Sequence, residues 1–168
     1  MGEDAQIKEA GIWAVLEQVT DPEVPVLSVV DLGIVRKVDV AADNTVTCIV
    51  TPTYSGCPAT DVININIRLA LLEAGFAAVN IQTVLSPAWT TEWMSEAGKQ
   101  KLKDYGIAPP NVQQVVCTID AFQQDEAVQC PRCGAYHTTL ISRFGSTACK
   151  ALYKCEECKE PFDYFKCH

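Results

Sequence analysis

Four cysteines in the last third of the sequence have the spacing of metal ligands. Cys130 and Cys133 form one C-x2-C pair, and Cys155 and Cys158 form a second pair after 21 intervening residues. Each pair directs two thiolates toward one point, and a two-stranded ribbon between the pairs brings all four thiolates around one tetrahedral ion. The spacing therefore predicts a zinc ribbon with these four residues as the ligands of one structural zinc ion.

Two other interpretations of the four cysteines stay open at this point. Four thiolates also bind iron, in a rubredoxin-like site. Two disulfides fit the same residues, although a reducing cytosol disfavours them. Four further residues are spare candidates, either for a second metal or for ordinary packing, and Cys149 is the substitute if one ligand is misassigned. They are Cys149, Cys167, His137 and His168.

Cys57 is the candidate for a reactive or transfer thiol. It stands directly before Pro58 and a predicted helix at 59–74. Proline favours the first helical position, so Cys57 is expected at the N-cap. The positive end of the helix dipole and the free N–H groups there would lower the pKa of its thiol. The alternative is an ordinary capping cysteine, whereas Cys48 and Cys117 lie in strand-like runs and are expected in the core.

Three acidic residues share the loop at 21–33, which its two prolines are expected to hold in an extended conformation. Asp21, Glu23 and Asp31 are candidate loop partners of Cys57 at one edge of the domain. The alternative is that they cap turns and helices, which is the commoner use of such side chains. The sequence contains only two histidines, no HExxH motif and no glycine-rich phosphate loop, so it lacks the machinery of an independent enzyme and we expect no catalysis of its own.

Hydrophobic periodicity and turn residues predict the elements that position these side chains. We expect helices at 5–19, 59–74 and 90–104, and strands at 34–40, 45–51 and 77–85. A Thr90 cap is expected to begin the third helix, and residues 106–111 are expected to form a rigid connection after it. The order α-β-β-α-β-α predicts an α+β fold, an α/β-like small domain whose first two strands form an antiparallel hairpin. The third strand is expected to run parallel to one of them.

A change in composition predicts a second domain. Six of the nine cysteines lie at or after Cys130. The predicted boundaries are 1–110 for the α/β domain, 111–127 for a linker or an extra strand, and 128–168 for the β zinc ribbon. Two ribbon strands are expected, one in AYHTTLISRF and one in ALYKC.

Charge and hydropathy restrict the partners. The net charge is −8, and residues 1–125 hold 16 acidic and 7 basic side chains, against 5 acidic and 6 basic ones in residues 126–168. An acidic body repels nucleic acid and anionic membranes, so neither is an expected partner. No apolar run approaches the ~20 residues that span a bilayer, and no signal peptide is evident. A cytoplasmic protein is expected, and a homo-oligomer stays open.

Longer motifs resemble a known family. DPEVPVLSVVDLGIV at 21–35 and TPTYSGCPA at 51–59 resemble the iron–sulfur assembly domain shared by SufT-type proteins and cytosolic iron–sulfur targeting factors. Together with CPRCG and the tail SRFGSTACKALYKCEECKEPFDYFKCH, they make the chain similar to the phenylacetate degradation protein D family over essentially its whole length. The resemblance implies an assembly domain followed by a zinc ribbon.

The resemblance also implies a function. Members associate with oxygenase or reductase components of the multicomponent phenylacetyl-CoA epoxidase, a system of phenylacetate catabolism. The implied role is an accessory or maturation factor that assists metal or iron–sulfur centre assembly, with transient iron or iron–sulfur as its cargo. Cys57 matches the characteristic cysteine of the family. The alternatives are a working subunit or electron carrier of the oxygenase complex, and a nucleic-acid-binding ribbon that the charge distribution disfavours.

Overall fold

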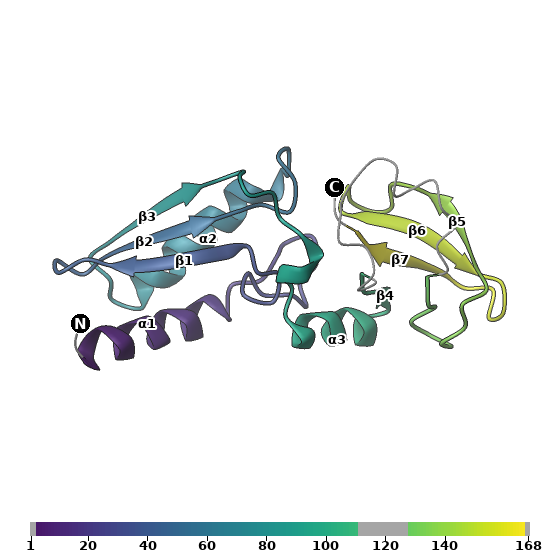
Figure 1. The fold of residues 1–168 in the computed structure, drawn as a ribbon, viewed down its shortest axis with the longest axis horizontal. Coiled ribbons are helices and arrows are strands. Elements are labelled where there is room, and N and C mark those ends of the chain that lie inside the picture. The colour runs from purple at the N-terminus through teal and green to yellow at the C-terminus, as the bar shows by residue number, and fades with distance from the viewer. Residues whose placement is uncertain (1–2, 111–127, 167–168) are drawn as a thin grey trace. The chain divides into compact units, whose positions relative to one another are not determined.

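The structure is a computed structural model that describes residues 3–110 and 128–166, with the backbone alone for residues 3–9. These residues form two compact units, which divide between Trp89 and Thr90 (Figure 1). The predicted linker or extra strand at 111–127, which includes Cys117, lies outside the described residues, as do Cys167 and His168. No helix in the described ranges is long and apolar enough to cross a membrane.

The first unit contains a three-stranded sheet and two helices. Its elements are α1 (Glu3–Leu16), β1 (Val35–Val40), β2 (Thr45–Val50), α2 (Ala59–Glu73) and β3 (Ala78–Thr83). The sheet order is β1-β2-β3, with β1 antiparallel and β3 parallel to β2. The predicted α-β-β-α-β order and both strand directions are therefore confirmed.

The core of this unit lies between β2 and the two helices. Alternate residues of β2, Val46, Cys48 and Val50, are buried, as expected for a strand with one face toward the core. Helix α2 contributes Ile63 and Ile67, along with other residues at four-residue spacing that share one helical face. The hairpin turn between β1 and β2 places Asn44 at a φ of 65°, and the Asp43 carboxylate accepts the N–H of Thr45 at 3.0 Å.

The segment between α1 and β1 is a closed, packed loop. We expected α1 to reach residue 19 and an extended loop to follow. The helix instead ends at Leu16, and the N–H of Val29 donates to the carbonyl of Val19 at 2.9 Å, which folds the loop back on itself. Four apolar side chains of the loop are buried, because folding back directs them into the core. They are Val24, Leu27, Val29 and Leu32.

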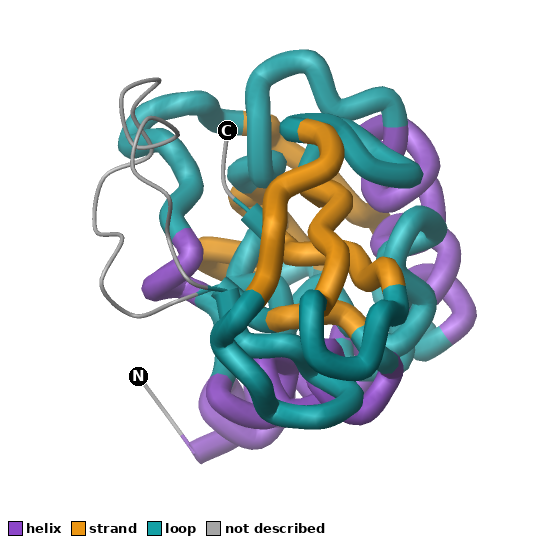
Figure 2. The backbone as a smooth tube through the Cα atoms, turned by 90° about the vertical axis from the view of Figure 1, so that its right-hand side faces the viewer, coloured by secondary structure: helices purple, strands orange, loops and turns teal. Residues whose placement is uncertain are grey.

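The second unit contains a short helix pair and a four-stranded sheet. Its elements are η1 (Thr91–Trp93), α3 (Glu96–Tyr105), β4 (Ile107–Ala108), β5 (Thr138–Ser142), β6 (Lys150–Cys155) and β7 (Pro161–Phe165). The sheet order is β4-β7-β6-β5. Figure 2 shows the strands in orange, the helices in purple and the loops and turns that connect them in teal.

Two predictions about this unit are wrong in detail. Thr90 does not cap the third helix: Met94 is extended, so α3 begins after Ser95, whose Oγ accepts the N–H of Gly98 at 2.8 Å. The ribbon also has more than the two predicted strands. Segment 107–108, expected to be a rigid connection, pairs in parallel with β7, and α3 and β4 therefore group with the ribbon.

Aromatic side chains of neighbouring strands pack against one another in the core of the ribbon. The rings of Tyr153 and Phe162 stack with centroids 5.9 Å apart, and Tyr164 meets Tyr153 edge-on at 5.7 Å. Ala108 of β4 and both first cysteines of the C-x2-C pairs, Cys130 and Cys155, belong to the same buried cluster. The first cysteine of each C-x2-C pair is thus part of the small core of this unit, whereas Cys133 and Cys158 are exposed.

Candidate metal centre and neighbouring thiols

The four predicted ligand cysteines come from two turns that flank the ribbon strands. Cys130 and Cys133 lie in the turn that precedes β5, while Cys155 ends β6 and Cys158 lies in the turn to β7. The two turns have similar backbone hydrogen bonds: the N–H of Cys130 donates to the carbonyl of Ala135 at 2.8 Å, and the N–H of Cys155 donates to that of Glu160 at 3.0 Å. The C-x2-C spacing is therefore held by the same local bond pattern twice.

The residue after each second cysteine adopts a left-handed backbone conformation. Gly134 has a φ of 77° and Lys159 a φ of 64°. Glycine adopts this conformation without steric cost, whereas a residue with a Cβ does so at a cost of about 1–2 kcal/mol. The glycine of CPRCG suits this conformation, whereas the lysine at the equivalent place in CEECK was not predicted, although an alignment of the two motifs indicates it.

The four sulfur atoms converge on one point. All four lie within 4.8 Å of one another, with Cys130 and Cys158 sulfurs 3.8 Å apart and Cys133 and Cys155 sulfurs 3.5 Å apart. The edge of a tetrahedron with zinc–sulfur bonds of about 2.3 Å measures about 3.8 Å. These separations fit four thiolates around one ion and are far longer than the ~2.05 Å of a disulfide. The donor set is therefore suited to a single metal ion.

Backbone donors favour the thiolate form at one of these sulfurs. The N–H of Cys158 is the main cause that lowers the pKa of Cys155 to about 7, with burial opposing the shift and the N–H of Glu157 adding to it. Metal binding requires deprotonated thiols, and the pKa values of Cys133 and Cys158 in the same group are raised, so the metal displaces protons from those two sulfurs when it binds.

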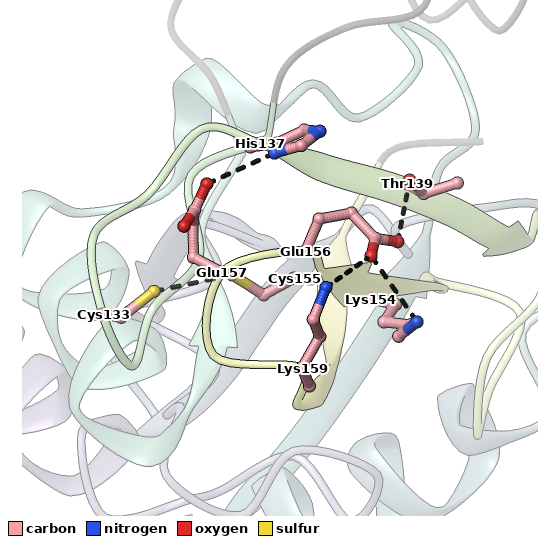
Figure 3. A network of polar contacts seen from close by, with 8 residues as sticks. All are labelled: Cys133, His137, Thr139, Lys154, Cys155, Glu156, Glu157 and Lys159. Atoms are coloured by element: carbon pink, nitrogen blue, oxygen red, sulfur yellow. Dashed lines mark hydrogen bonds and ion pairs between the residues drawn. The ribbon is translucent and has the colours of Figure 1, made fainter.

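A polar network surrounds the second turn (Figure 3). The Glu156 carboxylate lies 3.3 Å from the ammonium of Lys159 and 3.6 Å from that of Lys154, and it accepts the hydroxyl of Thr139 at 3.3 Å. The side-chain hydrogen bond from Lys159 is the main cause that lowers the pKa of Glu156. The network connects the turn to Thr139 of β5 and Lys154 of β6. It therefore supports the turn that carries Cys155 and Cys158 without supplying a ligand to the metal.

The spare candidates lie apart from the four sulfurs where the structure describes them. The His137 Nδ1 faces the Glu157 carboxylate at 3.3 Å, and the Cys149 thiol contacts the Thr147 hydroxyl at 3.0 Å. Within residues 3–110 and 128–166, the four cysteines are the single group that can hold a metal ion. Neither His137 nor Cys149 is part of it.

Cys57 lies one residue further from α2 than predicted. The helix begins at Ala59 with Pro58 at the N-cap, so Cys57 precedes the cap. Its carbonyl still accepts the N–H of Thr60 at 3.2 Å, so the chain is already turning into the helix there. The thiol is half-buried, whereas Cys48 in β2 is completely buried and its burial raises the pKa of that thiol to about 11.

The loop acids bind backbone groups of their own loop. Asp21 accepts the N–H groups of Glu23 and Val24 at 2.7 and 2.9 Å, and Asp31 accepts the N–H of Ser28 at 3.1 Å while the Ser28 hydroxyl accepts that of Asp31 at 2.9 Å. These are turn-capping bonds. The N–H of Thr51 donates to the carbonyl of Ile34 at 2.8 Å, so this loop and the segment leading to Cys57 meet at the same end of the sheet.

Comparison with protein families assigns both parts of the chain. A family model described as "Iron-sulfur cluster assembly protein" matches residues 9–82, and one described as "PaaD zinc beta ribbon domain" matches residues 115–166. A solved structure of a domain of unknown function, DUF59, from Bacillus anthracis is 29% identical and superposes with a TM-score of 0.55, covering 59% of this chain and 94% of that one. Fold and site together define an iron–sulfur assembly domain joined to a zinc ribbon.

Named relatives identify the family to which the chain belongs. An Escherichia coli protein named as a subunit of a "Putative 1,2-phenylacetyl-CoA epoxidase" is 51% identical over 156 residues, which is 93% of this chain and 91% of that protein. A Porphyromonas gingivalis protein named "Fe-S protein maturation auxiliary factor" is 39% identical over 56% of this chain and 90% of its own length. The chain belongs to the phenylacetate degradation protein D (PaaD) family.

Proposed function

We propose that this protein is an accessory factor that matures the multicomponent phenylacetyl-CoA epoxidase, assisting the assembly of a metal or iron–sulfur centre in one of its components. The observation that carries the proposal is the joining of an iron–sulfur assembly domain to a ribbon whose metal site is closed by four thiolates. Four thiolate ligands complete a tetrahedral site and leave no position for oxygen or substrate, so such a site serves structure rather than turnover.

The metal of the ribbon is zinc in this proposal, held by Cys130, Cys133, Cys155 and Cys158. It would fix the two turns and thereby the small core that contains Cys130 and Cys155. Zinc supplies no redox chemistry, so it cannot make the ribbon an electron carrier. The domain boundaries at 1–110, 111–127 and 128–168 stay a prediction. Residues 107–108, which form β4, pair with β7 in the sheet of the second unit.

Cys57 is the thiol that contacts the cargo or the client in this proposal. Cys57 is half-buried before α2, and Gly56 beside it has open space where a side chain would stand, so a partner can approach the backbone closely. Support for the client comes from the E. coli relative, and support for the assembly role comes from the P. gingivalis relative.

A timing experiment tests the maturation role. Cells that make the other epoxidase components without this chain should yield an inactive, metal-deficient complex. Complex matured in its presence should keep turning over after this protein is removed. The Cys57→Ser chain should fail to restore maturation in such cells, whereas a Cys149→Ser chain should restore it.

The alternative is a working subunit or electron carrier, which the word "subunit" in the name of the E. coli relative favours. Two measurements separate it from maturation. Four-thiolate iron absorbs visible light and zinc does not. In a reconstituted assay of fully metallated components, activity that rises with the concentration of this protein would make it a working subunit and end the maturation proposal.

A further inference from the structure

Helix α2 is apolar on two opposite faces. One face packs into the core through Ile63, Ile67 and Leu71. The opposite face carries four large aliphatic side chains whose exposed fractions are 45, 57, 51 and 40%. They are Val62, Ile65, Leu69 and Leu72, and together they form what we term the outer stripe. A surface helix ordinarily has polar residues on this side, so the outer stripe indicates a face that is covered in a larger assembly.

The spacing of the outer stripe fits a partner helix better than an extended peptide. Its members follow one another at intervals of three, four and three residues. This is the a/d spacing of a coiled-coil seam, in which side chains of one helix insert between those of another. An extended peptide would instead need contacts repeated every second residue.

Charges beside the outer stripe argue against a second copy of this chain. The spacing reads the same in both directions, so two copies would pair antiparallel, with Val62 opposite Leu72 and Ile65 opposite Leu69. That alignment places Arg68 beside its own symmetry mate near the centre of the seam, and like charges at such positions destabilise helix pairing. Residues 1–89 also hold 11 acidic and four basic side chains, so two copies repel one another.

We propose that the outer stripe of α2 docks an amphipathic helix of a partner protein, with an aliphatic seam, basic residues toward both ends and a carboxylate near the middle. The carboxylate would face Arg68, and the basic ends would face Asp61 and Glu73, which lie on the two flanks of the stripe near its ends. The net acidity of the first unit adds a longer-range attraction for such a helix. The proposal goes beyond the maturation role, because a working subunit would need a docking face equally.

Binding of synthetic helical peptides tests the proposal on the full-length protein. The probe is a peptide of about 20 residues with a leucine seam, lysines at both ends and one central glutamate; its control has the same composition with the seam scrambled. Fluorescence anisotropy should show binding of the seam peptide and at least about tenfold weaker binding of the scrambled one. Equal binding of the two peptides would overturn the proposal.

Variants of this chain locate the contact. The Ile65→Ser/Leu69→Ser double variant should bind the seam peptide at least about tenfold more weakly, because it lacks the two central apolar contacts. The matched control Asn66→Ser changes the flank of the same helix and should alter binding less than about twofold. Circular dichroism and retained metal content confirm that each variant is folded. Unchanged binding by the double variant would show that the peptide sits elsewhere.

A charge exchange tests the partner chemistry separately. The Arg68→Glu protein should bind the peptide with the central glutamate more weakly, and a peptide with lysine at that position should bind this variant tightly again. If the lysine peptide does not bind the Arg68→Glu protein more tightly than the glutamate peptide does, the pairing of Arg68 with a carboxylate of the partner is wrong.

Two further results would contradict a protein helix as the partner. One is sedimentation that shows a dimer of the unaltered protein which the double variant abolishes, and the other is flotation of the protein with phosphatidylcholine vesicles. These experiments measure peptide binding and not epoxidase activity. A negative result would therefore contradict the docking of a partner helix without contradicting the maturation proposal.

Discussion

The left-handed positions of the two ligand turns differ in how well their residues suit them. Gly134 and Lys159 occupy equivalent places after the second cysteine, with φ values of 77° and 64°. A Cβ at Gly134 would meet only the side-chain amide of Gln129 at 3.8 Å, so the cost of a substitution there is backbone strain rather than collision. The pair therefore offers a clean comparison of the same backbone strain at two sites.

We expect Lys159→Gly to stabilise the ribbon relative to Lys159→Ala by about 1 kcal/mol, because both lose the ion pair with Glu156 and only glycine relieves the strain. Gly134→Ala should destabilise by a similar amount. Competition with a zinc chelator measures both effects, and about 1 kcal/mol corresponds to about a fivefold change in metal affinity. Equal metal affinities of the Lys159→Gly and Lys159→Ala proteins would show that the strain is released elsewhere.

Thiol reactivity is a second test at the residue scale. Iodoacetamide at neutral pH should label Cys57 before Cys48 in the native, metal-loaded protein. Cys48 is fully buried with a raised pKa of about 11, so only about one in ten thousand of its thiols is ionised at pH 7. Raising the pH toward 11 should raise the labelling of Cys48, and urea should make the two thiols similar. If Cys57 proves the slowest thiol, it is a structural cap.

At the scale of elements, the metal joins the two ligand turns, and the first cysteine of each turn belongs to the core of the ribbon. We expect Cys155→Ser to release the metal and unfold the ribbon strands while the first unit stays folded, because structural zinc contributes roughly 10–16 kcal/mol in such small modules. Cys149→Ser is the matched control: this thiol lies outside the ligand group and contacts Thr147, so its metal content should be unchanged. Metal analysis and circular dichroism measure both. Full metal retention by the Cys155→Ser protein would refute the ligand assignment.

Sequence reasoning succeeded where the determining interactions are local. The four cysteines converge because each C-x2-C pair fixes its own turn, and α2 and the β1–β2 hairpin follow from periodicity and Asp43-Asn44. It failed where distant segments decide the outcome. A two-residue strand such as β4 has no periodicity of its own, and its pairing with β7 depends on residues more than 50 positions away. The buried positions of Val24 and Leu27 likewise depend on the closure of the loop.

At the scale of the whole molecule, the two units divide the chemistry between them. The first contains the half-buried Cys57 and the outer stripe of α2, which are the features that suit a cargo and a partner. The second contains the four-thiolate group within a small aromatic core. This division explains why a single chain matches two family models, and it assigns the proposed maturation chemistry to one unit and the metal-dependent scaffold to the other.

The parallel pairing of β4 with β7 also limits how this chain can be recombined with its relatives. The ribbon sheet takes one edge strand from residues 107–108, ahead of everything that the cysteine pattern identifies as ribbon. A chimera joined just before Cys130 would combine an edge strand from one parent with the three remaining strands from another. A crossover placed before Ile107 would transfer the sheet as one inherited piece, and a crossover near residue 90 would also keep η1 and α3 with it.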